Sequence, residues 1–263
     1  MNKIFDERLS ILYLEIRALK TYEERLNKWA EFTVDYCDNV AKTKIDRSFY
    51  AFQSEPKHEP DILILGLNPY GVYNYENQFS NEGWGVKQYG KMIPDVFIHQ
   101  NPWYIGGKEA DKIENGKKKK EWNILRNLNK TINIHPEFRK CFDNMVYMNI
   151  LFFNSKDFSE FKKSFKNEWL EVFDNCVKLS LLLICEVIKP KVILCLGVNH
   201  CFRPFIGRNK TEEMLPKSLY KSTIDGFRIY GMTHPSARIS NFKREEIGRC
   251  LFKEWLNIST SPI

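Results

Sequence analysis

Four short runs of mostly aliphatic and aromatic residues divide this chain, and each is too short to form a helix. They cover residues 61–65, 144–150, 191–196 and 227–232. The first run is apolar on both faces, which is typical of a strand buried inside a parallel sheet. We therefore expect four strands that pair in parallel.

Helical periodicity occurs before, between and after these runs. Apolar residues recur every three to four positions over 9–19, 22–40, 120–131, 159–188 and 241–255. Strands that alternate with helices predict an α/β fold with a doubly wound four-stranded parallel sheet. Residues 1–50 are expected to form a helical extension packed on the core, with a partner-binding arm as the alternative. Residues 51–263 would form one domain, interrupted by a long irregular insertion at about 72–135.

Polar residues stand where three of the four strands end. Gly66, Asn68 and Pro69 follow the first strand, Asn149 closes the second, and His234 follows the fourth. The carboxyl ends of parallel strands share one edge of a sheet, where α/β proteins bind ligands. We expect these side chains to gather there. Each segment taken alone is equally an ordinary turn or a strand-end cap.

Composition narrows the class of protein. The chain has 263 residues and a net charge of +7, which favours a polyanionic partner such as nucleic acid. Its seven cysteines are odd in number and form no Cys-x-x-Cys pair, so we expect reduced thiols in a cytoplasmic protein without zinc, an iron–sulfur cluster or another cofactor. No apolar run reaches membrane-spanning length. The lysine run at 117–120 is either a solvated loop or a phosphate contact.

Two segments together resemble the uracil-DNA glycosylase superfamily. Residues 66–71, Gly-Leu-Asn-Pro-Tyr-Gly, are similar to its water-activating motif, and residues 234–238, His-Pro-Ser-Ala-Arg, to its histidine-proline-serine loop. Asn149 matches the base-reading asparagine of the uracil-specific members. The resemblance covers residue 61 to the end of the chain. It implies a monomeric DNA glycosylase that flips a base out of the duplex and hydrolyses its glycosidic bond without a metal.

The resemblance also implies a role for each matching residue. Asn68 would orient the water, more slowly than an aspartate because an amide is a weak base. His234 would hydrogen-bond the departing base. Asn149 would read uracil through one donor and one acceptor. Gly66, Pro69, Ser236 and Arg238 would contact the DNA. Lys118 and Lys119 belong to the lysine run, which matches no family motif, and on a DNA enzyme they would be phosphate contacts.

The remaining implications concern which base is removed. Tyr70 matches a tyrosine that excludes thymine, and Phe79 or, as second choice, Trp84 would stack on the flipped base. Asn68 and Gly71 depart from the uracil-specific pattern, as does Ala237. A glycosylase for a hypermodified phage base is therefore an alternative. Two others are a catalytically inactive nucleic-acid-binding protein of this fold and a small-molecule enzyme that acts on nucleosides.

Overall fold

A computed structural model of the chain describes residues 3–69, 74–79, 85–99, 113–114, 117–118 and 123–259. Backbone contacts divide the chain into two compact units, each assembled from three segments. The first unit comprises Met1–Glu59, Gly66–Ala110 and Val146–Lys189, and the second comprises Pro60–Leu65, Asp111–Met145 and Pro190–Ile263. The two units are described separately below.

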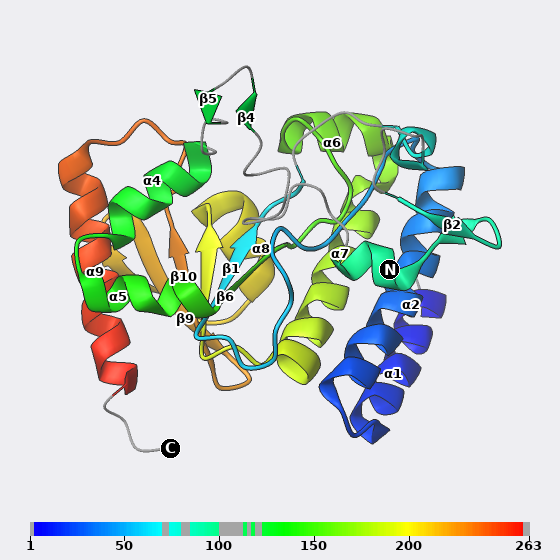
Figure 1. Cartoon of the computed structure of the whole chain (residues 1–263), viewed down its shortest axis with the longest axis horizontal. Coiled ribbons are helices and arrows are strands. Elements are labelled where there is room, and N and C mark those ends of the chain that lie inside the picture. The colour runs from blue at the N-terminus through cyan, green and yellow to red at the C-terminus, as the bar shows by residue number, and fades with distance from the viewer. Residues whose placement is uncertain are drawn as a thin grey trace. The chain divides into compact units, whose positions relative to one another are not determined.

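The N-terminal helices belong to the first unit. Helices α1 (Lys3–Ala18) and α2 (Tyr22–Thr43) confirm the helical extension predicted from periodicity (Figure 1). A capping box starts α2, because Glu24 N–H donates to Thr21 Oγ1 at 3.2 Å and Thr21 N–H donates to Glu24 Oε2 at 3.0 Å. The buried Trp29 of α2 donates its indole N–H to the carbonyl of Leu179 at 2.9 Å, which anchors the extension to α7 (Trp169–Leu182).

The rest of the first unit surrounds strand β6. Its further elements are η1 (Glu76–Phe79), β2 (Lys87–Gln88), β3 (Lys91–Met92), α3 (Pro94–His99), β6 (Met145–Asn149), α6 (Phe158–Phe165), η3 (Lys166–Glu168) and η4 (Leu183–Ile188). The single helix predicted over 159–188 is wrong in one respect, since it breaks at Lys166. Lys166 has φ 50°, a left-handed conformation that an α-helix cannot continue through.

Five strands of the main sheet lie in the second unit, where they stand in the order β1-β7-β10-β9-β8. Strands β1 (Ile62–Gly66), β7 (Val192–Leu196) and β10 (Phe227–Met232) are parallel, with Val192 in register with Ile62 and with Arg228. Strands β9 (Leu219–Ile224) and β8 (Glu212–Leu215) continue the sheet antiparallel. With β6 of the first unit, the main sheet has six strands.

The α/β class with a mostly parallel, helix-flanked sheet is thus confirmed, but the expected count of four strands is too low. The four predicted strands correspond to β1, β6, β7 and β10. The pattern missed β8 and β9 because β8 has no buried position and β9 buries only Leu219 and Ser222. A strand near the sheet edge needs few apolar residues, so it leaves little hydrophobic signal.

The helices of the second unit pack closely against one another and the sheet. The elements are β4 (Ile113–Glu114), β5 (Lys117–Lys118), α4 (Asn123–Ile132), α5 (Pro136–Lys140), η2 (Cys141–Asn144), η5 (Val198–Phe202), α8 (Arg203–Ile206) and α9 (Asn241–Ser259). Figure 1 draws α4, α5 and α9 side by side. Gly248 of α9 allows this approach, because a Cβ there would lie 1.9 Å from the carbonyl oxygen of Thr131.

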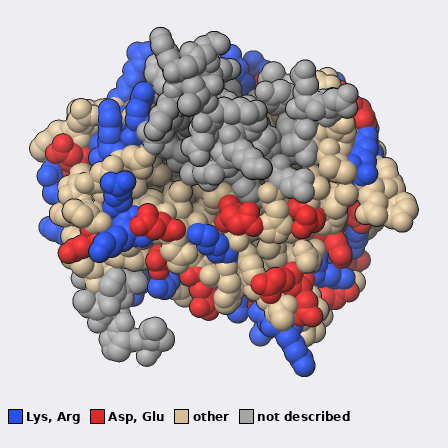
Figure 2. Space-filling view, in the orientation of Figure 1, with Lys and Arg blue, Asp and Glu red and all other residues tan. Residues whose placement is uncertain are grey.

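Charged side chains of both signs share the molecular surface. On the face drawn in Figure 2, lysine and arginine side chains are interspersed with aspartate and glutamate. All seven cysteines are free thiols, as expected from their number and spacing.

Candidate functional site

The candidate site of the first unit is built on the chain from β6 to Ser155. On one side, Asn149 N–H donates to the Ala51 carbonyl at 2.8 Å, within an antiparallel pairing of residues 48–54 with 147–154. On the other side, Ile150 N–H donates to the Gly66 carbonyl at 2.9 Å. These backbone bonds hold the segment that follows β1 and the segment that follows β6 in fixed register.

Asn68, the expected water-orienting residue, is held through its amide nitrogen. Nδ2 donates to the carbonyl of Pro69 at 2.7 Å, to the carbonyl of Ser155 at 2.9 Å and to Ser155 Oγ at 3.0 Å. Ser155 N–H also donates to the Pro69 carbonyl, at 3.0 Å. We call Pro69 O, Ser155 O and Ser155 Oγ the Asn68 acceptor set.

The acceptor set decides how the amide is oriented. Carbonyl oxygens can only accept, so the side-chain NH₂ of Asn68 must face them and Oδ1 must point the other way. Among the described residues, none donates a hydrogen bond to that oxygen. Asn68 is half-buried. Its Oδ1 is therefore a fixed acceptor that is open to a water molecule or a ligand.

Asn149 is the second polar residue of this site. Its side chain is 1% exposed, and its Nδ2 has no hydrogen-bond partner within the described part of the chain. Gly66 makes room for it, because a Cβ at residue 66 would lie 2.9 Å from Asn149 Oδ1. An unpaired buried donor is costly, and in a native structure it calls for a ligand or another explanation.

Asn154 lies five residues further along and is buried to the same extent, at 1% exposure. Its Nδ2 donates to Ser48 Oγ, and its backbone N–H donates to the Ser48 carbonyl at 3.0 Å. The same residue type on the same segment is thus satisfied at 154 and unsatisfied at 149. Among the described residues, two other buried amides of the first unit, Gln53 and Gln78, also have one unpaired atom each, so what sets Asn149 apart is an unpaired donor at the end of β6, beside Gly66.

The second unit carries the histidine loop, residues 234–238. The Ser236 N–H donates to His234 Nδ1 at 3.3 Å, and the Ser236 hydroxyl lies 2.6 Å from the same nitrogen. Nδ1 is therefore the acceptor, which leaves the proton of the neutral ring on Nε2. Burial lowers the pKa of His234 below its ordinary value of 6.5, so the ring is neutral at pH 7 with Nε2–H as a donor.

Three further residues of the second unit shape the histidine loop. The buried Arg244 of α9 donates to the carbonyls of Pro235 at 3.1 Å and Ala237 at 3.0 Å. Asn127 of α4 donates to the Pro235 carbonyl at 2.9 Å. Gly197, with φ 111°, lies under the ring, and an added Cβ there would be 3.7 Å from His234 Cδ2. The loop is thus pinned through its carbonyls.

The other sequence-predicted residues have varied settings. Pro69 is buried, while Ser236 and Arg238 are exposed. Phe79 packs edge-on against Tyr75 at 5.1 Å, with the Lys87 ammonium 4.3 Å from its ring centre. Lys118 lies in β5. Tyr70, Trp84 and Lys119 fall outside the described residues, as does the side chain of Lys118.

Sequence reasoning missed Ser155, Arg244 and Asn127. Ser155 carries no motif, because it is placed by the turn after β6. Arg244 and Asn127 sit in helices, where a polar residue ordinarily reads as a solvated position. A buried arginine in an amphipathic helix leaves no signal that separates it from a surface arginine.

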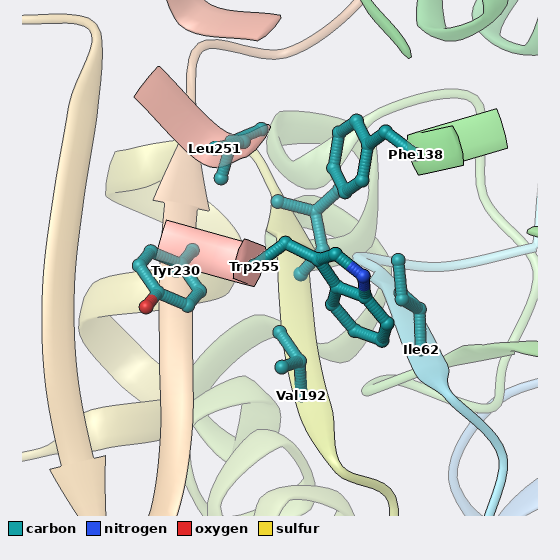
Figure 3. Close-up of a pocket in the computed structure, with 7 residues that line it drawn as sticks. Ile62, Phe138, Val192, Tyr230, Leu251 and Trp255 are labelled. Carbon is teal, nitrogen blue, oxygen red and sulfur yellow. The ribbon is translucent and has the colours of Figure 1, made fainter. Parts of the chain in front are cut away.

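The second unit also holds a small apolar cavity, with room for about one water molecule. Figure 3 shows Trp255 of α9 reaching toward Ile62 and Val192. The complete lining is Ile62, Phe138, Val192, Leu194, Tyr230, Leu251 and Trp255. The lining is mostly aliphatic and aromatic, and the Tyr230 hydroxyl is engaged because it donates to Glu254 at 2.8 Å. The cavity is a packing gap in the core.

Two other features, a metal cluster and a membrane-spanning helix, are absent from the parts of the chain that the structure describes. No group of three or more His, Cys, Asp or Glu side chains there is placed to hold a metal ion. No described helix is long and apolar enough to cross a membrane. The sequence matches neither any protein-family model nor any curated protein.

Proposed function

We propose that this protein is a DNA glycosylase with a fold of the uracil-DNA glycosylase type. The observation that carries the proposal is the unpaired Nδ2 of Asn149, buried beside Gly66. A donor kept unsatisfied inside a protein is destabilising, so it is expected to serve a ligand. The edge of a flipped base, with its carbonyl and N–H groups, supplies both the acceptor that Nδ2 lacks and a donor for Oδ1.

The reaction is hydrolysis of the N-glycosidic bond. Asn68 Oδ1 accepts a hydrogen bond from a water molecule and orients its oxygen toward the anomeric carbon. A bond forms between the water oxygen and that carbon, while the bond from the carbon to the base nitrogen breaks and its electron pair leaves with the base. One water proton passes to the solvent or the departing base. The products are the free base and an abasic sugar.

His234 stabilises the departing base. Its Nε2–H donates to a base carbonyl, where negative charge develops as the glycosidic bond breaks. The neutral ring suits this task because its donor is present without a proton transfer. Ser236 fixes the tautomer, and the exposed Arg238 contacts the DNA backbone.

The preferred base is uracil. Its Watson–Crick edge presents a carbonyl and an N–H side by side, which match the amide of Asn149. Tyr70 supports this choice through its match to the tyrosine that excludes thymine. A modified pyrimidine with the same edge is the alternative substrate, and the test below includes it.

The test is a base-release assay on labelled oligonucleotides, followed by alkaline cleavage at abasic sites. The panel contains uracil opposite guanine, uracil opposite adenine, single-stranded uracil, thymine opposite guanine, hypoxanthine and hypermodified pyrimidines. We expect release of uracil, with a loss of at least about 100-fold in Asn68→Ala and in His234→Ala. His58→Ala, at a partly exposed histidine of the first unit, is the control that should keep full activity.

Each other outcome corrects the proposal in a defined way. Release of a modified base alone would keep the mechanism and change the substrate. Binding to DNA without release of any base would replace the enzyme with a nucleic-acid-binding protein. Activity on free deoxyuridine but not on DNA would indicate a nucleoside hydrolase.

A further inference from the structure

The groups around the side chain of Asn68, the residue proposed to orient the water, suit an amide and do not suit a carboxylate. All three members of the Asn68 acceptor set lie within 3.0 Å of Nδ2, and two of them are carbonyl oxygens. A carbonyl has no hydrogen to donate, so an ionised oxygen in the place of Nδ2 would face two partial negative charges at hydrogen-bond distance. Only the Ser155 hydroxyl could turn to donate to it.

We propose that Ser155 is a positioning residue that commits this site to asparagine, so that an aspartate at residue 68 cannot do the same work. Ser155 supplies two of the three acceptors, and it is 1% exposed. Its carbonyl and hydroxyl lock the amide nitrogen and thereby aim Oδ1. This inference rests on the proposed function, since the oxygen it aims is the one that holds the water.

The inference reverses a simple expectation from chemistry. A carboxylate is a stronger base than an amide, so Asn68→Asp would be expected to accelerate water attack. In this site the carboxylate is repelled by the carbonyls of Pro69 and Ser155 and turns away from the productive orientation. Asn68→Asp should therefore be slower than the wild type by at least about 100-fold, close to the loss expected for Asn68→Ala.

Ser155→Ala tests the hydroxyl separately. It removes one of three hydrogen bonds to Nδ2 and keeps both carbonyls. We expect the single-turnover rate of base release to fall about three- to tenfold, which is the change that corresponds to one neutral hydrogen bond. The affinity for DNA that carries an uncleavable uracil analogue should stay unchanged, because Ser155 positions the water acceptor and touches no DNA.

Ser48→Ala is the matched control. Ser48 is also fully buried, its hydroxyl also accepts from an asparagine amide, and it lies in the segment that pairs with residues 147–154. Ser48→Ala and Ser155→Ala should lower the melting temperature to a similar extent. Only Ser155→Ala should slow base release, and an equal loss of rate in both variants would reduce Ser155 to a structural residue and overturn the inference.

A spectroscopic measurement separates this inference from the proposed function. The side-chain NH₂ signal of Asn68 in a ¹⁵N–¹H spectrum is assigned by its absence in Asn68→Ala. It should exchange slowly with water in the wild type, shift in Ser155→Ala and stay in place in Ser48→Ala. If this pattern holds while the wild type releases no base, the proposed function fails and the locked amide stands. If the wild type is active and Asn68→Asp equals or exceeds it, the inference alone is wrong.

Discussion

Replacing Asn149 by leucine should stabilise the folded protein. Leucine has nearly the shape of asparagine and no polar atoms. The substitution removes a buried Nδ2 that has no partner among the described residues, and the desolvation of such a group costs about 1–3 kcal/mol. Imperfect repacking beside Gly66 costs less than about 1.5 kcal/mol. With about 2 kcal/mol for the first effect and about 1 kcal/mol for the second, we expect a net gain of about 1 kcal/mol in the free energy of unfolding.

Asn154→Leu is the control for this prediction, because Asn154 has the same burial and a satisfied amide. Its substitution breaks the hydrogen bond to Ser48 Oγ and should destabilise the protein by about 1–3 kcal/mol. Urea unfolding measures both variants against the wild type. The midpoint should rise for Asn149→Leu and fall for Asn154→Leu, with unchanged slopes.

The sign of the change in Asn149→Leu decides the argument. A loss of stability comparable to that of Asn154→Leu would mean that Asn149 is satisfied in the free protein, for example by a buried water. The reasoning that links this residue to a ligand would then be refuted. A stabilised variant that no longer releases base would instead show that stability is given up here for function.

Three further predictions concern the second unit. Arg244→Met removes both charged hydrogen bonds that hold the histidine loop, so the free energy of unfolding should fall by about 2–3 kcal/mol and base release should slow. Unchanged kinetics in a folded variant would show that the loop is held without Arg244. Burial raises the pKa of Glu254, but hydrogen bonds from Lys221 and Tyr230 outweigh this effect and lower the pKa below 4.5. Glu254→Gln should therefore reduce the free energy of unfolding by about 0.5–1 kcal/mol at pH 7, and the difference should vanish as the pH falls below the folded-state pKa. A difference that persists at low pH would contradict this. Val192→Ile adds one methylene beside the apolar cavity and should stabilise the protein by up to about 0.8 kcal/mol in thermal unfolding. A lower melting temperature would contradict this and show that the cavity cannot take the added methylene.

The parts of the fold that the sequence predicts are those with strong hydrophobic patterns. Strands β1, β6, β7 and β10 and the two N-terminal helices were found because most of their core positions are apolar. Strands β8 and β9 were missed because few of their positions are buried, so they leave little hydrophobic pattern. The break at Lys166 was missed for a similar reason, since a lysine gives no warning of a left-handed backbone.

The candidate site divides in the same way. Asn68, Asn149 and His234 could be proposed from the sequence because each follows a strand and matches a motif. The residues that fix their orientation could not. Ser155 acts on an amide that is far away in the sequence, and Arg244, although close in sequence to the carbonyls it binds, has the pattern of a surface residue on a helix. Asn68 and Ser155 are separated by 87 residues in the sequence, so no local pattern reveals their contact.

Three asparagines of the first unit differ in hydrogen-bond state, although they are the same residue type. Asn154 has its amide satisfied and serves the fold. Asn68 has its nitrogen held and its oxygen open, and Asn149 has its nitrogen unpaired. The two incomplete residues are complementary, since one offers an acceptor and the other a donor. Under the proposed function, the acceptor would hold a water molecule and the donor a base carbonyl, and hydrolysis of a base from its sugar requires both of these ligands.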